Sequence, residues 1–178
     1  MGPPAPPTRR VRLNKKRPMR IAIHAVGKLK AGPERELADR YLDRADKAGR
    51  AIGFSSVTAR EIVESRAREA LQRKEEEARE LLSDLPPGAL LIALDERGDS
   101  PTSERFAEML GEARDRGTPN TVLLIGGPDG HGQELLSRAG HRISFGRLTW
   151  PHQIVRILAA EQVYRAVTIL SGHPYHRP

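Results

Sequence analysis

Residues 89–94 read ALLIAL and residues 121–125 read TVLLI; both are short, continuous apolar runs followed by polar or glycine-rich segments. Strands that are covered on both faces give such runs, whereas strands with one solvated face alternate between apolar and polar residues. Sheets of the first kind are mainly parallel and carry helices on each side. The two runs therefore predict an α/β fold built around a mainly parallel sheet.

The rest of the chain alternates between strand-like and helical patterns. Apolar residues recur at helical spacing after Pro33 and Pro151, two prolines placed where helices begin. We expect Ser103 to cap a helix and the acidic run 75–77 to lie on a solvated helix face. The expected strands are 20–26, 54–63, 89–94, 121–125 and 143–145, and the expected helices are 34–48, 64–85, 103–114, 134–139 and 151–170.

Composition indicates a globular chain with a single core. The chain has 178 residues, of which 38% are hydrophobic and 30% are charged. It contains no cysteine, which excludes disulfides and thiolate metal sites. No stretch approaches the roughly 20 apolar residues that a membrane span requires. We therefore expect a cytoplasmic protein without a membrane partner.

The positive charge is concentrated at the amino end. Six cations and no acid lie in residues 1–18, and they account for all but one unit of the net charge of +7. This Pro-rich, basic segment has too little apolar surface to fold, so we expect a disordered tail followed by one domain at 19–178. Two interpretations of the tail stay open: it contacts polyanions, or it is an inert extension ahead of a second start at Met19.

Three strand ends are candidates for a ligand site, because open α/β sheets bind ligands beyond the carboxyl ends of their strands. They are Leu94, the pair Gly126 and Gly127, and the segment 145–150. Glycine after a buried strand lets backbone groups approach a ligand without a Cβ in between. Such a three-loop cradle suits a flat ring held by backbone atoms. The alternative is that the glycines merely make turns.

The carboxyl end combines titratable, aromatic and charged residues at unusual density. Four of the six histidines follow residue 140, and the chain ends in HPYHR at 173–177. Glu161 and Arg165 are four residues apart on the last expected helix. They form either a surface ion pair or a functional pair in which Glu161 positions Arg165 for a phosphate.

Other kinds of site fit poorly. The segment Gly130-His-Gly132 lacks the third glycine of a dinucleotide fingerprint, because position 135 is leucine, and no acid follows at 135–160. No Gly-Lys-Ser/Thr occurs for a phosphate loop. His173 and His176 are separated by Pro174 and have no acidic neighbour later in the chain, so no metal is expected.

Motifs spread over the whole chain from Met19 resemble one family. The residues that carry the resemblance are IHAVGKLK (23–30), LDERG (94–98), SERFA (103–107), LIGGPDG (124–130), LTWPHQ (148–153), EQVYRA (161–166) and HPYHR (173–177). They resemble the small SPOUT-class methyltransferases that methylate N3 of a pseudouridine in bacterial 23S ribosomal RNA. The resemblance implies a carboxyl-terminal trefoil knot, which is a rare exception to the rule against knots. It also implies a homodimer that acts on the assembled 70S ribosome.

The resemblance further implies that S-adenosylmethionine binds in the loops of the knot and that the partner chain completes the active site. The cofactor-binding residues would be Leu94, Gly126, Gly127, Phe145, Gly146, Arg147, Leu148, Thr149 and Trp150. Methylation at N3 requires loss of an imide proton, so a base and a cation are needed beside the ring. The candidates are His152, Arg165, Tyr175, His176 and Arg177. The competing hypotheses are a non-catalytic ribosome-binding or RNA-binding module of the same fold and a nucleotide-dependent oxidoreductase, against which the missing dinucleotide fingerprint argues.

Overall fold

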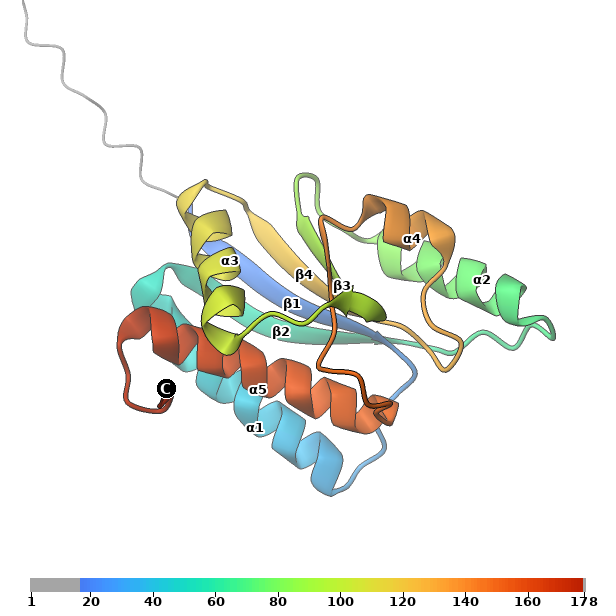
Figure 1. The fold of residues 1–178 in the computed structure, drawn as a ribbon, viewed down its shortest axis with the longest axis horizontal. Coiled ribbons are helices and arrows are strands. Elements are labelled where there is room, and N and C mark those ends of the chain that lie inside the picture. The colour runs from blue at the N-terminus through green and yellow to red at the C-terminus, as the bar shows by residue number, and fades with distance from the viewer. Residues whose placement is uncertain (1–16, 178) are drawn as a thin grey trace, which may run out of the picture.

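The computed structural model describes residues 17–177, so the expected tail lies outside the described residues except for its last two positions. Within this described range, five strands form one sheet, in the order β2-β1-β4-β3-β5 (Figure 1). Every neighbouring pair is parallel, which confirms the predicted sheet type. The strands are β1 (Met19–Val26), β2 (Phe54–Ile62), β3 (Leu90–Asp99), β4 (Asn120–Ile125) and β5 (His141–Ile143).

Helices cover both faces of this sheet (Figure 1). Helices α1, α3 and α5 share one core with the sheet, and α2 and α4 share a second core on the other face. The helices are α1 (Pro33–Gly49), a 3-10 turn η1 (Arg50–Ile52), α2 (Ala70–Ser83), α3 (Ser103–Asp115), α4 (Gln133–Arg138) and α5 (His152–Ser171). Within residues 17–177 no helix is long and apolar enough to cross a bilayer.

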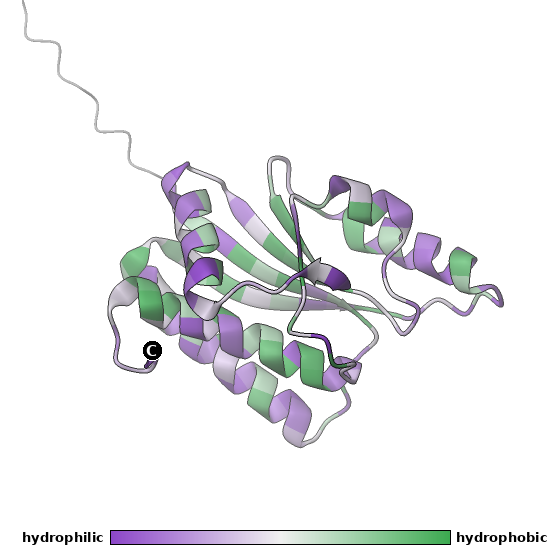
Figure 2. Ribbon diagram, viewed as in Figure 1, coloured by the Kyte–Doolittle hydropathy of each residue, from purple (hydrophilic) through white to green (hydrophobic). Residues whose placement is uncertain are grey.

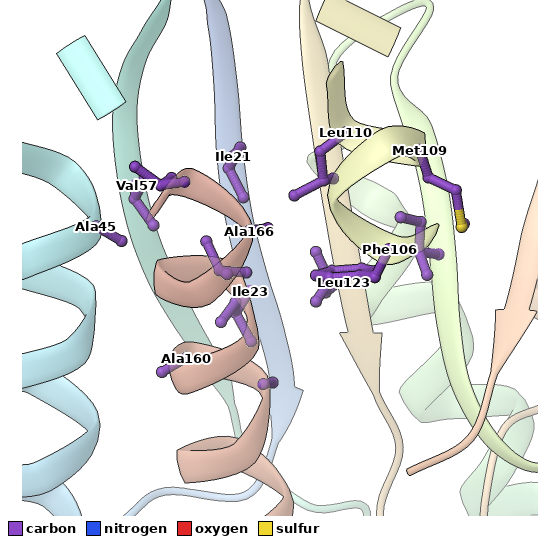
Figure 3. Close-up of a cluster of buried hydrophobic side chains, with 14 of the residues drawn as sticks. Ile21, Ile23, Ala45, Val57, Phe106, Met109, Leu110, Leu123, Ala160 and Ala166 are labelled. Carbon is purple, nitrogen blue, oxygen red and sulfur yellow. The ribbon is translucent and has the colours of Figure 1, made fainter. Parts of the chain in front are cut away.

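The two apolar runs of the sequence are explained by these two cores. Leu123 of β4 lies in the α1/α3/α5 core, whereas its neighbours Val122 and Leu124 lie in the α2/α4 core. Figure 3 shows the first core, where Ile21, Ile23, Val57 and Leu123 face Ala45, Phe106, Leu110, Ala160 and Ala166 of the helices. Figure 2 shows the hydrophobic residues along the strands and on the first half of α5.

The structure corrects several expected boundaries. Helix α2 begins at Ala70, six residues later than expected, and β5 occupies 141–143 in place of 143–145. Strand β3 continues through the expected loop 95–98, because Asp99 pairs again with Ile143 beyond a register shift. Side-chain capping of α3 comes from Thr102, whose Oγ1 accepts from the Arg105 N–H, and not from Ser103.

The acidic run 75–77 does not lie wholly in solvent. Glu77 is only 5% exposed, and its Oε1 accepts a hydrogen bond from the Ser65 N–H at 3.0 Å. Burial raises the pKa of the Glu77 carboxyl. The expectation of a solvated face was wrong at this position because residues 64–69 fold back over α2 as an irregular segment.

Candidate active site

The three positions selected from the sequence as strand ends lie side by side, although β3 continues beyond Leu94 to Asp99. Strand β3 sits between β4 and β5, and Leu94 pairs with both Ile125 and Ile143. Because all strands are parallel, the chain leaves β4 at Gly126 and β5 at Ser144 on the same edge of the sheet. We call these three neighbouring segments the cradle; that they bind a ligand stays a prediction.

The buried side chain of His131 bridges the neighbouring strands β3 and β4 at this edge of the sheet. It is 7% exposed, and its Nε2 lies 3.1 Å from the Leu94 carbonyl oxygen and 3.2 Å from that of Leu124. Carbonyls only accept, so Nε2 carries the proton and donates to both. In the sequence, His131 is marked only by the glycines on either side of it. Its side chain is buried because the loop at 126–132 turns it back under the strands.

Burial lowers the pKa of His131 below its ordinary value of 6.5. The unfolded chain therefore takes up a proton below about pH 6.5 that the folded chain does not. Stability is fully present above that pH and is lost as the pH falls. From pH 7.5 to 5.5 we expect this residue to remove up to about 1.4 kcal/mol from the free energy of unfolding. Urea unfolding of the wild type and of His131→Leu at both pH values measures the difference; an equal loss in both proteins contradicts the assignment.

Gly126 and Gly127 are needed for close packing of the loop itself. A Cβ on Gly126 would lie 3.0 Å from the Gly130 carbonyl carbon and 3.2 Å from His131 Nδ1. A Cβ on Gly127 would lie 2.7 Å from Glu77 Oε2. The alternative that the sequence left open, that these glycines are needed for the turn itself, therefore holds at both positions. Their close packing also fixes the path of the loop.

The segment after β5 forms the rim of the cradle. The Ser144 N–H donates to the Asp99 carbonyl at 2.7 Å, and the Ser144 hydroxyl donates to the Gly146 carbonyl at 2.8 Å. Gly146 has φ +112°, and a Cβ there would meet no atom within 4 Å, so backbone conformation and not crowding favours glycine. Phe145 and Gly146 are half-buried, whereas the four residues that follow are exposed: Arg147, Leu148, Thr149 and Trp150.

A second group of predicted residues gathers at the carboxyl end. Gly172 ends α5 in the left-handed conformation, φ 72°, and the chain turns back along the helix. Tyr175 then lies with its ring 4.7 Å from the Tyr164 ring, while the Arg165 guanidinium sits 4.9 Å from the Tyr175 ring centre. The Tyr175 hydroxyl donates to Glu161 Oε1 at 3.1 Å. Burial, with hydrogen bonds to Tyr41 and Glu161, raises the pKa of Tyr175, so its phenol stays neutral.

Arg165 connects this aromatic contact to His176. Its Nε and Nη2 donate to Glu161 Oε1 at 3.0 and 2.5 Å, which confirms the predicted pair. Its Nη1 lies 3.2 Å from His176 Nδ1. Because a guanidinium cannot accept a hydrogen bond, Nδ1 must be the acceptor and carry a lone pair. His176 is therefore an imidazole with its proton on Nε2, and Arg177 beside it is exposed.

The predicted residues do not form a single site within one chain. His152 is half-buried in the first turn of α5, next to the cradle, whereas Arg165 lies thirteen positions further on. At 1.5 Å per residue the two are roughly 20 Å apart along the helix. The cradle with His152 and the cluster of Arg165, Tyr175 and His176 are thus two separate groups.

Comparison with known proteins bears on both groups. Residues 19–176 match the family described as "Predicted SPOUT methyltransferase". The chain is 58% identical over 159 residues to the "Ribosomal RNA large subunit methyltransferase H" of Chelativorans sp. (strain BNC1), covering 89% of this chain and 91% of the relative. It is 56% identical to the protein of the same name from Methylocella silvestris, covering 89% and 99%.

A solved structure gives a weaker likeness. The SpoU methyltransferase AviRb from Streptomyces viridochromogenes, crystallised in complex with the cofactor AdoMet, matches with a TM-score of 0.38 and 12% identity. The match covers 85% of this chain but only 61% of that one. The family match spans both the strand-end loops and the carboxyl-terminal cluster. The chain is a member of the SPOUT methyltransferase family.

Proposed function

We propose that the protein transfers a methyl group from S-adenosylmethionine to N3 of a pseudouridine in 23S ribosomal RNA, acting as a homodimer on the assembled 70S ribosome in the cytoplasm. Membership of the family supports methyl transfer. The relatives that share more than half of their residues with this chain are named for methylation of large-subunit ribosomal RNA, which supports the substrate class. The deep knot expected for the family belongs to the same proposal.

The cradle has the features that a bent nucleoside ligand needs. The Leu94 carbonyl oxygen, which accepts from His131 Nε2 at 3.1 Å, lies beside the Gly126 loop. Gly146 leaves open space above the rim. Leu94, Gly126, Gly127 and residues 145–150 would therefore hold S-adenosylmethionine, chiefly through backbone groups. Bound there, it supplies an electrophilic methyl group on a sulfonium centre.

His176 is the proposed base, because its unprotonated Nδ1 can accept the N3 proton of the pyrimidine ring. In the resting chain that lone pair is covered by an Arg165 N–H. An anionic RNA group, either a phosphate or the developing imidate oxygen, would draw the Arg165 N–H away and expose Nδ1. The proton then moves to Nδ1 as N3 forms its bond to the methyl carbon and the bond to sulfur breaks. Tyr175 stays a neutral phenol and contributes its ring and hydroxyl to positioning.

A second copy of the chain would bring the two groups together. The cradle and the His176 cluster are separated along α5, and α5 carries several apolar side chains between them. Ile154, Ile157 and Leu158 of this stretch are half-buried, and at the adjoining rim of the cradle Leu148 is 73% exposed and Trp150 is 39% exposed. Such a patch is typical of a contact surface. A two-fold dimer through this patch would place His176 of one protomer beside the cradle of its partner.

Calorimetry with S-adenosylmethionine tests the enzyme against the non-catalytic module. We expect saturable binding that the truncation of residues 175–178 leaves intact, since the cradle is formed before α5. If a folded, dimeric protein gives no binding heat with S-adenosylmethionine, the enzyme hypothesis is contradicted and a module that only binds the ribosome is favoured.

Gly146→Val tests the position of the cradle. Valine in the left-handed region costs roughly 1–3 kcal/mol of backbone strain, and its side chain would project into the open space. We expect at least about a tenfold loss of affinity for S-adenosylmethionine, which corresponds to about 1.4 kcal/mol. Calorimetry measures it, with Gly117→Val as the control, because Gly117 also has positive φ and open surroundings but lies at the opposite end of the sheet. Equal affinities of the two variants contradict the assignment.

A further inference from the structure

Helix α3 supplies a carboxylate to the histidine at the carboxyl end. Glu104 Oε1 lies 2.7 Å from His176 Nε2, across 72 positions of sequence. Since Arg165 forces Nδ1 to be the acceptor, Nε2 carries the proton and donates it to this carboxylate. Both nitrogens of the His176 ring are thus engaged, one by a cation and one by an anion.

The backbone that carries Glu104 is firmly held. Thr102 caps the helix by accepting from the Arg105 N–H at 3.2 Å. The Ser103 hydroxyl donates to Gln162 Oε1 at 2.8 Å, which joins the first turn of α3 to α5. Phe106, two residues after Glu104, is buried in the core. Glu104 is therefore presented to His176 by a fixed helix end even though its own side chain is 49% exposed.

Glu104 also stays ionised. Its own backbone N–H, followed by the hydrogen bond from His176 and that from Thr102, lowers the pKa of its carboxyl. A negative charge near the first turn of a helix is stabilised in addition by the helix dipole. Glu161 is not available for the same task, because its Oε1 already accepts from Arg165 and Tyr175.

We propose that Glu104 is a positioning residue for His176: it fixes the imidazole with the proton on Nε2 and stabilises the imidazolium that forms when Nδ1 takes up a proton. The step rests on the proposed function, in which His176 is the base. A carboxylate behind a histidine performs these two tasks in hydrolases, where it orients the ring and does not itself receive the proton. The two acids of the cluster then have different partners, Glu161 for Arg165 and Glu104 for His176.

Ring nitrogen shifts of His176 test the contact without any reaction. In the full-length protein labelled with ¹⁵N-histidine, we expect His176 to be a single neutral tautomer with the proton on Nε2. Glu104→Ala should broaden or shift the Nε2 signal, because the acceptor is lost. Glu108→Gln is the matched control, since Glu108 is an exposed carboxylate one turn further along α3 that pairs with Arg105. Unchanged His176 signals in Glu104→Ala overturn the inference, whatever the activity of the wild type.

Single-turnover methyl transfer to ribosomes tests the consequence. We expect Glu104→Gln and Glu104→Ala to lower the rate roughly 10- to 100-fold with unchanged affinity for S-adenosylmethionine, because the charge that stabilises the imidazolium is removed in both. The acid limb of the rate profile should move to lower pH, which a merely structural residue would not cause. Wild-type rates in both variants overturn the inference and leave the proposed function intact. Absence of transfer by the wild type contradicts the proposed function. In that case the ¹⁵N shifts of His176 still test whether Glu104 holds the ring.

Discussion

His176→Ala is expected to lower the single-turnover rate of methyl transfer by roughly 100- to 10,000-fold, the range that a general base contributes. The reason is that Nδ1 of His176 is the unprotonated nitrogen of the carboxyl-terminal cluster, held in that state by Arg165. Binding of S-adenosylmethionine should stay within about twofold of the wild type, because within the chain His176 bonds to Arg165 and Glu104 and not to the cradle. The measurement is rapid-quench transfer to ribosomes under saturating enzyme, together with calorimetry for the cofactor.

Two further histidine variants show whether a loss of activity is specific to His176. His141→Ala is the control, because His141 is exposed on β5 outside both groups. His152→Ala removes the alternative base at the start of α5. Near-normal rates in both His176→Ala and His152→Ala show that neither residue takes the proton. A large loss in His152→Ala alone transfers the role to His152.

Complementation between two impaired variants is expected to restore activity when S-adenosylmethionine is too dilute to load the cradle of Gly146→Val. Gly146→Val damages the cradle and His176→Ala damages the cluster, so each homodimer lacks a complete site. A mixed dimer has one site with both groups intact if the cradle of one protomer works with the cluster of the other. Random exchange of equal amounts should therefore recover about a quarter of the wild-type activity, given two equivalent sites in a two-fold dimer.

The same mixture separates this arrangement from a site within one chain. If cradle and cluster act within a single protomer, every chain in the mixture carries one lesion and no activity returns. Subunit exchange must be shown independently, by mass spectrometry of differently tagged protomers. No recovery after complete exchange contradicts the shared site.

Much of the fold follows from local sequence signals. The apolar runs at 89–94 and 121–125 predicted buried parallel strands, and the two-faced core confirms why they are continuously apolar. The start of α2 was missed, because residues 64–69 have helical composition but are held in an irregular path by hydrogen bonds from the Ser65 and Ala67 N–H groups. The extension of β3 was also missed, since only pairing with β5 converts 95–99 into strand.

For the candidate site, too, features set by neighbouring residues were predictable and features set by distant contacts were not. The closeness of Leu94 and Gly126 was predictable, because parallel strands place their carboxyl ends at one edge of the sheet. His131 and Glu104 were not, because their roles depend on contacts 37 and 72 positions away in the sequence. Glu77 was misjudged for a related reason: its burial depends on the Gly127 loop and on Ser65, neither of which helical periodicity reveals.

Transfer of label from S-adenosylmethionine to 70S ribosomes purified from a strain lacking the protein tests the central claim most directly. The wild-type protein should introduce one methyl group per ribosome, and mass spectrometry of the digested 23S RNA should locate it on N3 of a pseudouridine. Large-subunit RNA from a strain lacking the protein should miss that same methyl group. Label that appears on another base or in the small subunit, or RNA from the deletion strain that is fully methylated at this position, would contradict the account.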